Sequence, residues 1–485
     1  MLFGSLEFVL AFLPVTLLVY HLLRRHWGAK PAKLFLVLAS LFFYGWWNWR
    51  YVPLIGISIL ANFALSKWIE VHRGHVRLAT GLGIAANLGL LGYYKYANFF
   101  VSTLDQAGFE FVIPHVVLPL AISFFTFQQI SYLVESARDD QGAPALLDYA
   151  LFVLFFPHLI AGPITHHKEM LPQFEAIATR PLPPEHCRIG LVMFIGGLAK
   201  KVLIADGFAY VADPLFDAVR DGGVLPSRDA WLGAISYTLQ LYFDFSGYSD
   251  MAIGLGLMFG ILLPVNFASP YKSTSIIEFW RRWHISLSRF LRNYLYIPLG
   301  GNRRGASRRS LNLVITMTLG GIWHGAGFTF LIWGLLHGCY LLIANLWRTW
   351  VRLPAHPIFA LSGWLLTMLA VVFAWVLFRS TSFAAAASMV LSMVMPTHGT
   401  LPPTPLNAIG WCAVVLGVIV VTRLPNLVEM AGYPMSTPGL PIEHDGIVPV
   451  TWRLQPVAVI LIFGFFAGLA FARLPNPGVF IYFNF

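Results

Sequence analysis

The sequence predicts an all-α polytopic membrane protein, and three observations lead to that fold class. The chain has 485 residues, of which 57% are hydrophobic and only 11% charged, and its mean hydropathy is +0.69. So few charges cannot coat a water-soluble globule of this size. The apolar residues also fall in runs of roughly 17 to 25 residues, the length of a helix that crosses a hydrocarbon layer about 30 Å thick.

We expect about eleven spanning helices, give or take two, from these runs. Their approximate ranges are 5–23, 32–48, 52–68, 78–100, 146–161, 189–211, 230–260, 311–347, 358–378, 405–422 and 454–473. Several runs are too long or too short for a single straight helix. Residues 112–134 and 382–396 are typical of broken, re-entrant or surface-lying pieces, which a bilayer tolerates only where the backbone is buried in protein. No repeat or soluble domain is evident, so we expect one domain over 1–485.

The charged residues predict the orientation of the chain. The first apolar run lacks the basic start and small-residue cleavage site of a signal peptide, so we expect it to stay as an anchor. Arg24, Arg25, Lys30 and Lys33 follow it without an acid, which places that loop in the cytoplasm and the N-terminus outside. The same rule places the loop GGNRRGASRR, 300–309, in the cytoplasm. The loop with Asp213, Asp217, Asp221 and Asp229 suits the outer face.

The net charge of +10 is explained by these topology signals and by contact with anionic lipid headgroups. We therefore expect no nucleic-acid partner. The chain has three cysteines, Cys187, Cys339 and Cys412, and they lack the spacing of a metal site. No metal is predicted.

One long interval of the chain has no acid. Between Glu278 and Glu429 there is no Asp or Glu, although arginines are frequent in the first part of that interval. A catalytic base there cannot be a local carboxylate. A neutral imidazole is the natural alternative, because its ordinary pKa of about 6.5 leaves it mostly unprotonated at neutral pH and burial lowers that value further.

Two histidines lie in the apolar segment GIWHGAGFTFLIWGLLHG, 321–338. His324 stands among glycines that permit close backbone approach and a break in the helix, and we favour a catalytic role over a structural one. His337 follows thirteen residues later, about 140° away on an uninterrupted helix, so the pair would not share a face. For His337 we favour packing.

His284 lies in EFWRRWHISLSRFLRNYLYIPLGGNRRG, where aromatic and aliphatic residues recur at helical spacing. This pattern predicts an amphipathic helix near a membrane boundary. Arg281 and Arg282 then either face lipid headgroups or meet an anionic ligand from the cytoplasm, with His284 pointing inward.

A further polar cluster, LYFDFSGYSDMAIG at 241–254, places Asp244 and Asp250 in an apolar span. Intramembrane acids are costly and normally pair or line a cavity. The first interpretation is a structural hub, with Arg281 or Arg282 as the partner. The second is contact with substrate or orientation of a catalytic histidine.

Three ordered motifs carry a resemblance to a known family. They are YFDFSGYSDMAIGLGLMFG, PVNFASPYKSTSIIEFWRRWHISLSRFLRNYLYIPLGGNR and GIWHGAGFTFLIWGLLHG. The chain closely resembles the membrane-bound O-acyltransferase family, in the branch of bacterial alginate O-acetyltransferase membrane subunits. Earlier segments such as FFPHLIAGPITHHKEMLPQF fit as well. The core motifs occupy about 35–345, and the likeness weakens in the C-terminal helices, about 355–475.

The resemblance implies a ring of helices around a thinned centre that is open to both membrane faces. It implies that His324 of the WHG motif is catalytic and that His284 is the second polar residue of the active site. The candidate binding residues for substrate or acyl donor are Trp323, Arg281, Arg282, Asn302, Arg303, Asp244 and Asp250.

The expected activity is transfer of an acetyl group from cytoplasmic acetyl-CoA across a bacterial inner membrane to an exopolysaccharide such as alginate. Acetyl-CoA is a substrate here, and no bound cofactor is expected. The resemblance supplies a partner, a periplasmic acyltransferase of the serine hydrolase type. Three alternatives stay open: acetylation of another polymer such as cellulose or peptidoglycan, D-alanyl export from a carrier-protein thioester, and a transporter or flippase without chemistry. The last predicts inverted repeats with midplane charge pairs, and we find no such repeats.

Overall fold

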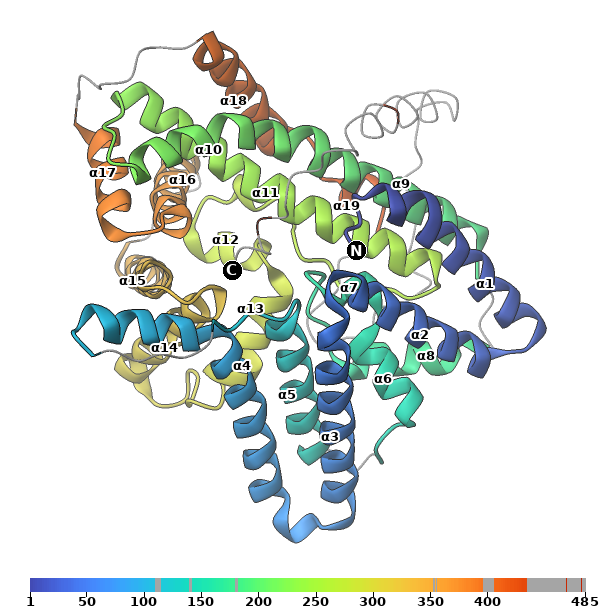
Figure 1. Cartoon of the computed structure of the whole chain (residues 1–485). Helices are drawn as coiled ribbons and strands as arrows, with labels where there is room; N and C mark the ends of the chain where they lie inside the picture. The colour runs from blue at the N-terminus through green and yellow to red at the C-terminus, as the bar shows by residue number, and fades with distance from the viewer. Residues whose placement is uncertain are drawn as a thin grey trace. The chain divides into compact units, whose positions relative to one another are not determined.

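The computed structural model describes residues 1–109, 115–138, 142–178, 182–351, 354, 356–395, 405–433, 468 and 481. Every regular element within these ranges is a helix, as Figure 1 shows. The described part of the chain therefore confirms the all-α class that its composition predicts.

The chain divides into two compact units, each of which is discontinuous in sequence. The first comprises Met1–Gly196, Tyr248–Val265 and Ala431–Phe463, and the second Gly197–Gly247, Asn266–Met430 and Gly464–Phe485. Helix α11, Ser227–Met258, contributes residues to both units. The single domain expected over 1–485 stays a prediction.

The first unit is a group of apolar helices held together at a few polar contacts. In chain order it contains η1 Phe8–Phe12, α1 Leu13–His26, α2 Ala29–Asn48, η2 Trp49–Tyr51, α3 Val52–Val71, η3 Arg73–His75, α4 Val76–Gln106, α5 Ile122–Arg138, α6 Leu146–Leu154, α7 Phe156–Leu159, α8 His167–Glu175, η4 Ala176–Ala178 and most of α9 Pro184–Ala199. Helices α3, α4 and α5 lie side by side (Figure 1). The amide of Asn87 donates to Asn62 Oδ1 at 2.7 Å, and Lys33 pairs with Asp148 at 2.6 Å. Such polar contacts join helices where surrounding apolar side chains give no preference between partners.

The second unit contains the histidines of interest. Its elements are η5 Lys200–Ala205, α10 Asp206–Arg220, most of α11, η6 Pro270–Lys272, α12 Ile276–Arg282, α13 Ile285–Leu291, η7 Arg292–Tyr296, α14 Gly305–His324, α15 Phe328–Trp350, α16 Pro357–Arg379, α17 Phe383–Val394, α18 Pro405–Arg423 and α19 Leu427–Met430. Its core is aromatic: the ring of Trp375 lies 5.6 Å from Trp333 and 5.0 Å from Trp283, centre to centre. The side chains of Trp283, Trp333 and Trp375 are fully buried in this core.

Four segments of the described chain are long and apolar enough to cross a membrane by length and composition. They are Phe8–His26, Ala29–Val71, Phe328–Trp350 and Pro357–Arg379. The total of about eleven spans stays a prediction, and the run expected at 454–473 lies outside the described residues except for Gly468. Large apolar side chains such as Leu60, Leu82 and Phe100 are more than half exposed, as expected for helices whose solvent is lipid.

The structure breaks several apolar runs that are too long or too short for one helix. The run at 311–347 becomes α14 and α15, that at 189–211 becomes α9, η5 and α10, and that at 146–161 becomes α6 and α7. The described residues of 112–134 begin with nonhelical chain before α5, and most of 382–396 forms the short α17.

The single amphipathic helix expected around His284 is wrong. The segment instead forms α12, α13 and the π-helical η7, with α12 ending at Arg282 and α13 beginning at Ile285. The physical reason is that His284 adopts a left-handed backbone conformation, which an α-helix cannot contain.

Candidate functional site

His324 lies at a sharp turn between two closely packed helices. Helix α14 ends at His324, Gly325 is extended, and α15 begins at Phe328. The two helices pack side by side (Figure 1), and a Cβ added at Gly334 of α15 would overlap the carbonyl of Met317 on α14. Small residues therefore let the backbones approach each other, and the helix pair projects His324 from the point where the chain reverses.

Aromatic rings surround the His324 imidazole. Ring centres of Trp323, Trp333 and Phe378 lie 5.0, 5.2 and 5.4 Å from it, and the residue is buried. Trp323, a sequence-predicted binding residue, is buried against it. The His324 side chain therefore lies in an apolar, aromatic enclosure.

At the other break, His284 contacts the side chain of Asn266. Its Nδ1 lies 3.2 Å from Asn266 Oδ1, which also accepts from the backbone N–H of Ser286 at 3.1 Å and from its hydroxyl at 2.8 Å. The N–H of Ile285 donates to the Asn266 carbonyl at 3.0 Å. Because the Ser286 N–H can only donate, the oxygen of the amide must face this group and Nδ1 must carry a proton. Nε2 of His284 then has the lone pair that can accept a proton.

The two histidines come together in space. Their ring centres are 6.3 Å apart, although forty residues separate them in the chain. Phe245 of α11 packs edge-on against His284 at 4.7 Å. At this separation both imidazoles can reach one bound group, such as a carbonyl under attack and the hydroxyl that attacks it. The structure thus brings together the two histidines that the family resemblance assigns to one active site, and their catalytic roles stay a prediction.

His337 lies behind this pair. Its Nδ1 accepts a hydrogen bond from the indole N–H of Trp280 at 3.3 Å, and its ring lies 4.8 Å from that of Trp333. Trp333 thus separates His337 from His324, because it contacts both rings. This arrangement agrees with the packing role favoured for His337.

Asp244 is buried in an ion network whose cation the sequence analysis did not identify. Lys201 lies 2.8 Å from Asp244 and 2.6 Å from Asp206, and the backbone N–H of Ile481 donates to Asp244 at 2.9 Å. The expectation that Arg281 or Arg282 pairs with Asp244 is therefore wrong. A desolvated acid needs a cation within direct contact distance, and the π-helical turn η5 supplies Lys201. The other acid of the cluster, Asp250, is buried in the first unit.

The candidate donor-binding residues lie in more exposed positions. Arg282 pairs with Glu278 at 2.8 Å and donates to the Ala268 carbonyl, whereas Arg281 is exposed. Asn302 and Arg303 are exposed in the loop before α14, where Asn302 accepts a hydrogen bond from the Tyr296 hydroxyl. Their roles in binding stay predictions.

Asn266 and Lys201 are the residues that sequence reasoning missed. Asn266 lies in PVNFASP, before the segment that contains His284. The feature that could have identified it is a lone amide side chain in an otherwise apolar stretch. Lys201 lies in GLAKKVLIAD, where a basic pair interrupts an apolar run. Over the described ranges, no group of three or more His, Cys, Asp or Glu residues has the arrangement of a metal site.

Buried imidazoles in an aromatic, apolar setting define a class: an integral membrane protein whose site is suited to acid–base chemistry by histidine. Comparison with known proteins is more specific. The model of the membrane-bound O-acyltransferase family matches residues 9–390. The chain belongs to the membrane-bound O-acyltransferase family and is an acyltransferase.

Relatives within the family carry several names. A peptidoglycan O-acetyltransferase of Helicobacter pylori is 45% identical over 81% of this chain and 80% of its own length. A probable alginate O-acetylase AlgI of Pseudomonas putida is 40% identical over the whole of both chains. A teichoic acid D-alanyltransferase of Streptococcus thermophilus is 30% identical over 47% of this chain and 57% of its own length.

Proposed function

We propose that this acyltransferase moves an acetyl group from cytoplasmic acetyl-CoA across the bacterial inner membrane for O-acetylation of an alginate-like exopolysaccharide. The observation that carries the proposal is the buried pair of His324 and His284, with ring centres 6.3 Å apart. The full-length relative named alginate O-acetylase supports the choice of polymer.

The chemistry assigned to the pair is general base catalysis. His324 takes the proton of an acceptor hydroxyl as its oxygen attacks the thioester carbonyl carbon. The carbon–sulfur bond then breaks, and the proton passes to the leaving thiolate, which departs as free CoA. General base assistance of this kind increases a rate by roughly 10² to 10⁴. During the attack, the carbonyl oxygen becomes an oxyanion that needs hydrogen-bond donors. Backbone N–H groups around the glycines of GIWHGAG are candidates for this role.

The acceptor hydroxyl belongs, in this proposal, to a periplasmic acyltransferase of the serine hydrolase type. That partner receives the acetyl group at the outer face and passes it to the polymer. The outer loops would form the contact, and the acidic segment 212–229 is one candidate. There, Asp213 pairs with Arg379 at 3.0 Å, and Arg220 pairs with Asp217 at 2.7 Å.

Reconstitution tests the proposal. The purified chain in proteoliposomes with acetyl-CoA should exchange or hydrolyse the thioester slowly and leave external polymer unmodified until the periplasmic partner is added. The His324→Ala variant is the matched control, and it should lose both reactions. Efficient polymer acetylation by the chain alone would contradict the relay, and no consumption of acetyl-CoA under any condition would contradict the donor.

Two relatives favour alternative acceptors or donors. The peptidoglycan O-acetyltransferase relative supports peptidoglycan as the polymer, and the D-alanyltransferase relative supports a carrier-protein thioester as the donor. The same proteoliposomes, offered peptidoglycan fragments or a D-alanyl carrier protein in place of the first substrates, distinguish these possibilities.

The proposal also needs a defined orientation, with the N-terminus in the periplasm and the loop 300–309 in the cytoplasm. Ser307 is exposed in the first turn of α14, which begins at Gly305 within that segment. A Ser307→Cys variant, made with the native cysteines replaced, should react with a membrane-impermeant thiol reagent only after spheroplasts are opened. Labelling of intact spheroplasts would reverse the orientation.

A further inference from the structure

The side-chain amide of Asn266 has two polar atoms, and only its oxygen has partners in the described part of the chain. Because the backbone N–H of Ser286 can only donate, the oxygen faces Ser286 and the N–H₂ group takes the other position of the amide. Asn266 is fully buried, and its Nδ2 has no hydrogen-bond partner among the described residues. The amide therefore presents a buried donor.

A buried donor without an acceptor is costly at this place. Val265 and Phe267, on either side of Asn266 in the chain, are buried apolar residues. A buried N–H group without an acceptor gives up its hydration and receives no hydrogen bond in exchange, so nearly all buried polar groups in proteins are paired. An acceptor that binds from outside the chain would offset this cost.

The Asn266 donor lies beside the two histidines of the site. Covalent geometry puts Nδ2 about 2.2 Å from Oδ1, so Nδ2 is within about 5.5 Å of His284 Nδ1. The ring of His284 is in turn 6.3 Å from that of His324, centre to centre. A molecule that contacts both imidazoles is therefore close enough to reach Asn266 as well.

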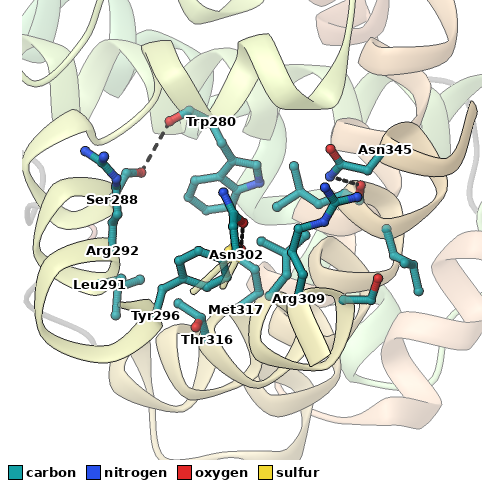
Figure 2. Close-up of a pocket in the computed structure, with 14 residues that line it drawn as sticks. Trp280, Ser288, Leu291, Arg292, Tyr296, Asn302, Arg309, Thr316, Met317 and Asn345 are labelled. Atoms are coloured by element: carbon teal, nitrogen blue, oxygen red, sulfur yellow. Dashed lines mark hydrogen bonds between the residues drawn. The ribbon is translucent and has the colours of Figure 1, made fainter. Parts of the chain in front are cut away.

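Space for part of a substrate lies along α13, the helix that begins one residue after His284. A cavity of about 360 Å³ is lined there by Ser288 and Leu291 of α13 and by Trp280 of α12, as Figure 2 shows. The backbone N–H of Ser288 donates to the His284 carbonyl at 3.0 Å, so this lining residue is one helical turn, about 6 Å, from His284. The volume is within the range of small-molecule sites.

The surroundings of Asn266 select a neutral acceptor. A charged group is expensive to move into an apolar site, and Asn266 supplies no charge to offset a phosphate or a carboxylate. A carbonyl oxygen accepts without donating, so it matches an N–H₂ group that can only donate. A pantetheine thioester, the form in which coenzyme A and acyl carrier proteins both carry an acyl group, has such oxygens in its thioester and in its amides.

We propose that Asn266 binds the acyl donor, with its N–H₂ group donating to a carbonyl oxygen of the pantetheine thioester. This contact rests on the proposed function, because it needs a thioester at the histidine pair. Asn266 then has two separable roles: its nitrogen binds the donor, and its oxygen positions the His284 imidazole. Loss of the nitrogen raises KM for the donor, whereas loss of the oxygen lowers kcat.

The substitution Asn266→Asp separates the two roles, because it replaces only the N–H₂ group. Thiol release from acetyl-CoA in proteoliposomes should show a KM about five-fold higher and a kcat within about two-fold of the unaltered chain. The assay is run at pH 8, which favours the ionised form of the introduced carboxyl group.

Asn426→Asp is the matched control. The N–H₂ group of Asn426 already donates to the Ser269 hydroxyl at 2.9 Å, and its oxygen caps α19 by accepting from the N–H of Glu429. Both kinetic constants should stay unchanged in this variant. An unchanged KM in a folded Asn266→Asp chain, or an equal rise in the control, would overturn the inference. No thiol release by the unaltered chain would instead contradict the proposed function, and the contact with it.

A second measurement keeps the inference falsifiable if the aspartate variant does not fold. A cryo-EM structure of the His324→Ala chain with acetyl-CoA should place a carbonyl oxygen within about 3.2 Å of Asn266 Nδ2. The same structure distinguishes a thioester oxygen from an amide oxygen at that position. A water molecule alone beside Nδ2, with the donor bound elsewhere, would overturn the inference.

Discussion

The break between α14 and α15 and the break between α12 and α13 each present one histidine, but different residues hold them in place. At the first, glycines allow close helix packing, and aromatic rings of Trp323, Trp333 and Phe378 surround His324. At the second, no glycine is present: His284 itself takes φ 44° and ψ 55°, and Asn266 fixes it by hydrogen bonds. The comparison teaches that one histidine is positioned by packing and the other by a polar contact that offsets backbone strain.

The largest expected effect is at the packed break. His324→Ala should reduce acetyl transfer to background, because no carboxylate in that part of the sequence can replace the base. The measurement is polymer acetylation in cells with the variant as their only copy. Membrane insertion and protein level serve as controls and should not change. Normal acetylation would remove His324 from the mechanism.

At the strained break, two substitutions separate chemistry from backbone conformation. His284→Ala and His284→Gly should both lower acetyl transfer by about 10² or more, since both remove the imidazole. The glycine variant should be more stable than the alanine variant by about 1 kcal/mol, because glycine adopts left-handed dihedrals without a Cβ clash. Thermal unfolding in detergent, followed by tryptophan fluorescence, measures the difference. Equal stability of the two would show that the strain at residue 284 is absent.

Asn266→Ala tests the polar contact that the packed break does not have. The substitution leaves His284 Nδ1, Ser286 N and Ser286 Oγ without their common acceptor. We expect a loss of roughly ten-fold in acetyl transfer and of about 1 to 3 kcal/mol in stability. Asn266→Asp keeps an acceptor oxygen at that position and should retain more activity. If alanine and aspartate behave alike, Asn266 does not position the imidazole.

The smallest effect is expected at His337, which is near His324 but belongs to the packing behind it. His337→Phe removes one long hydrogen bond, 3.3 Å from Trp280 Nε1, and keeps an aromatic ring of similar size. Acetyl transfer should stay within about three-fold, and stability should fall by about 1 kcal/mol or less. A loss of activity comparable to that of His324→Ala would give His337 a role in the chemistry.

The local sequence predicts the helix break at His324 but not the one at His284. The break that the sequence predicts beside His324 is present in the structure. The segment GGIWHGAG indicates it, because several glycines in an apolar run permit both a turn and close packing. The break at His284 had no such signal, since RRWHISLS continues a helical pattern through it. The hydrogen bonds that Asn266, eighteen residues earlier, accepts from Ile285 and Ser286 show why the helix stops there.

The sequence also does not identify which cation pairs with a buried acid. Asp244 was recognisable as costly inside an apolar span, yet its cation could not be chosen among several basic residues. Lys201 became the partner because η5 and α11 meet in the folded chain, at a separation of forty-three residues.

Composition and short motifs by themselves determined that the chain is a helical membrane protein, that its central interval lacks acids, and that His324 stands at a glycine-rich break. Hydropathy, charge and glycine act on the residues that carry them, so they can be read locally. The tertiary structure alone decided that His284 lies 6.3 Å from His324, that Asn266 selects the proton-bearing nitrogen of His284, and that Trp333 separates His337 from the pair. These contacts join residues far apart in the chain, and their geometry depends on how whole helices pack against one another.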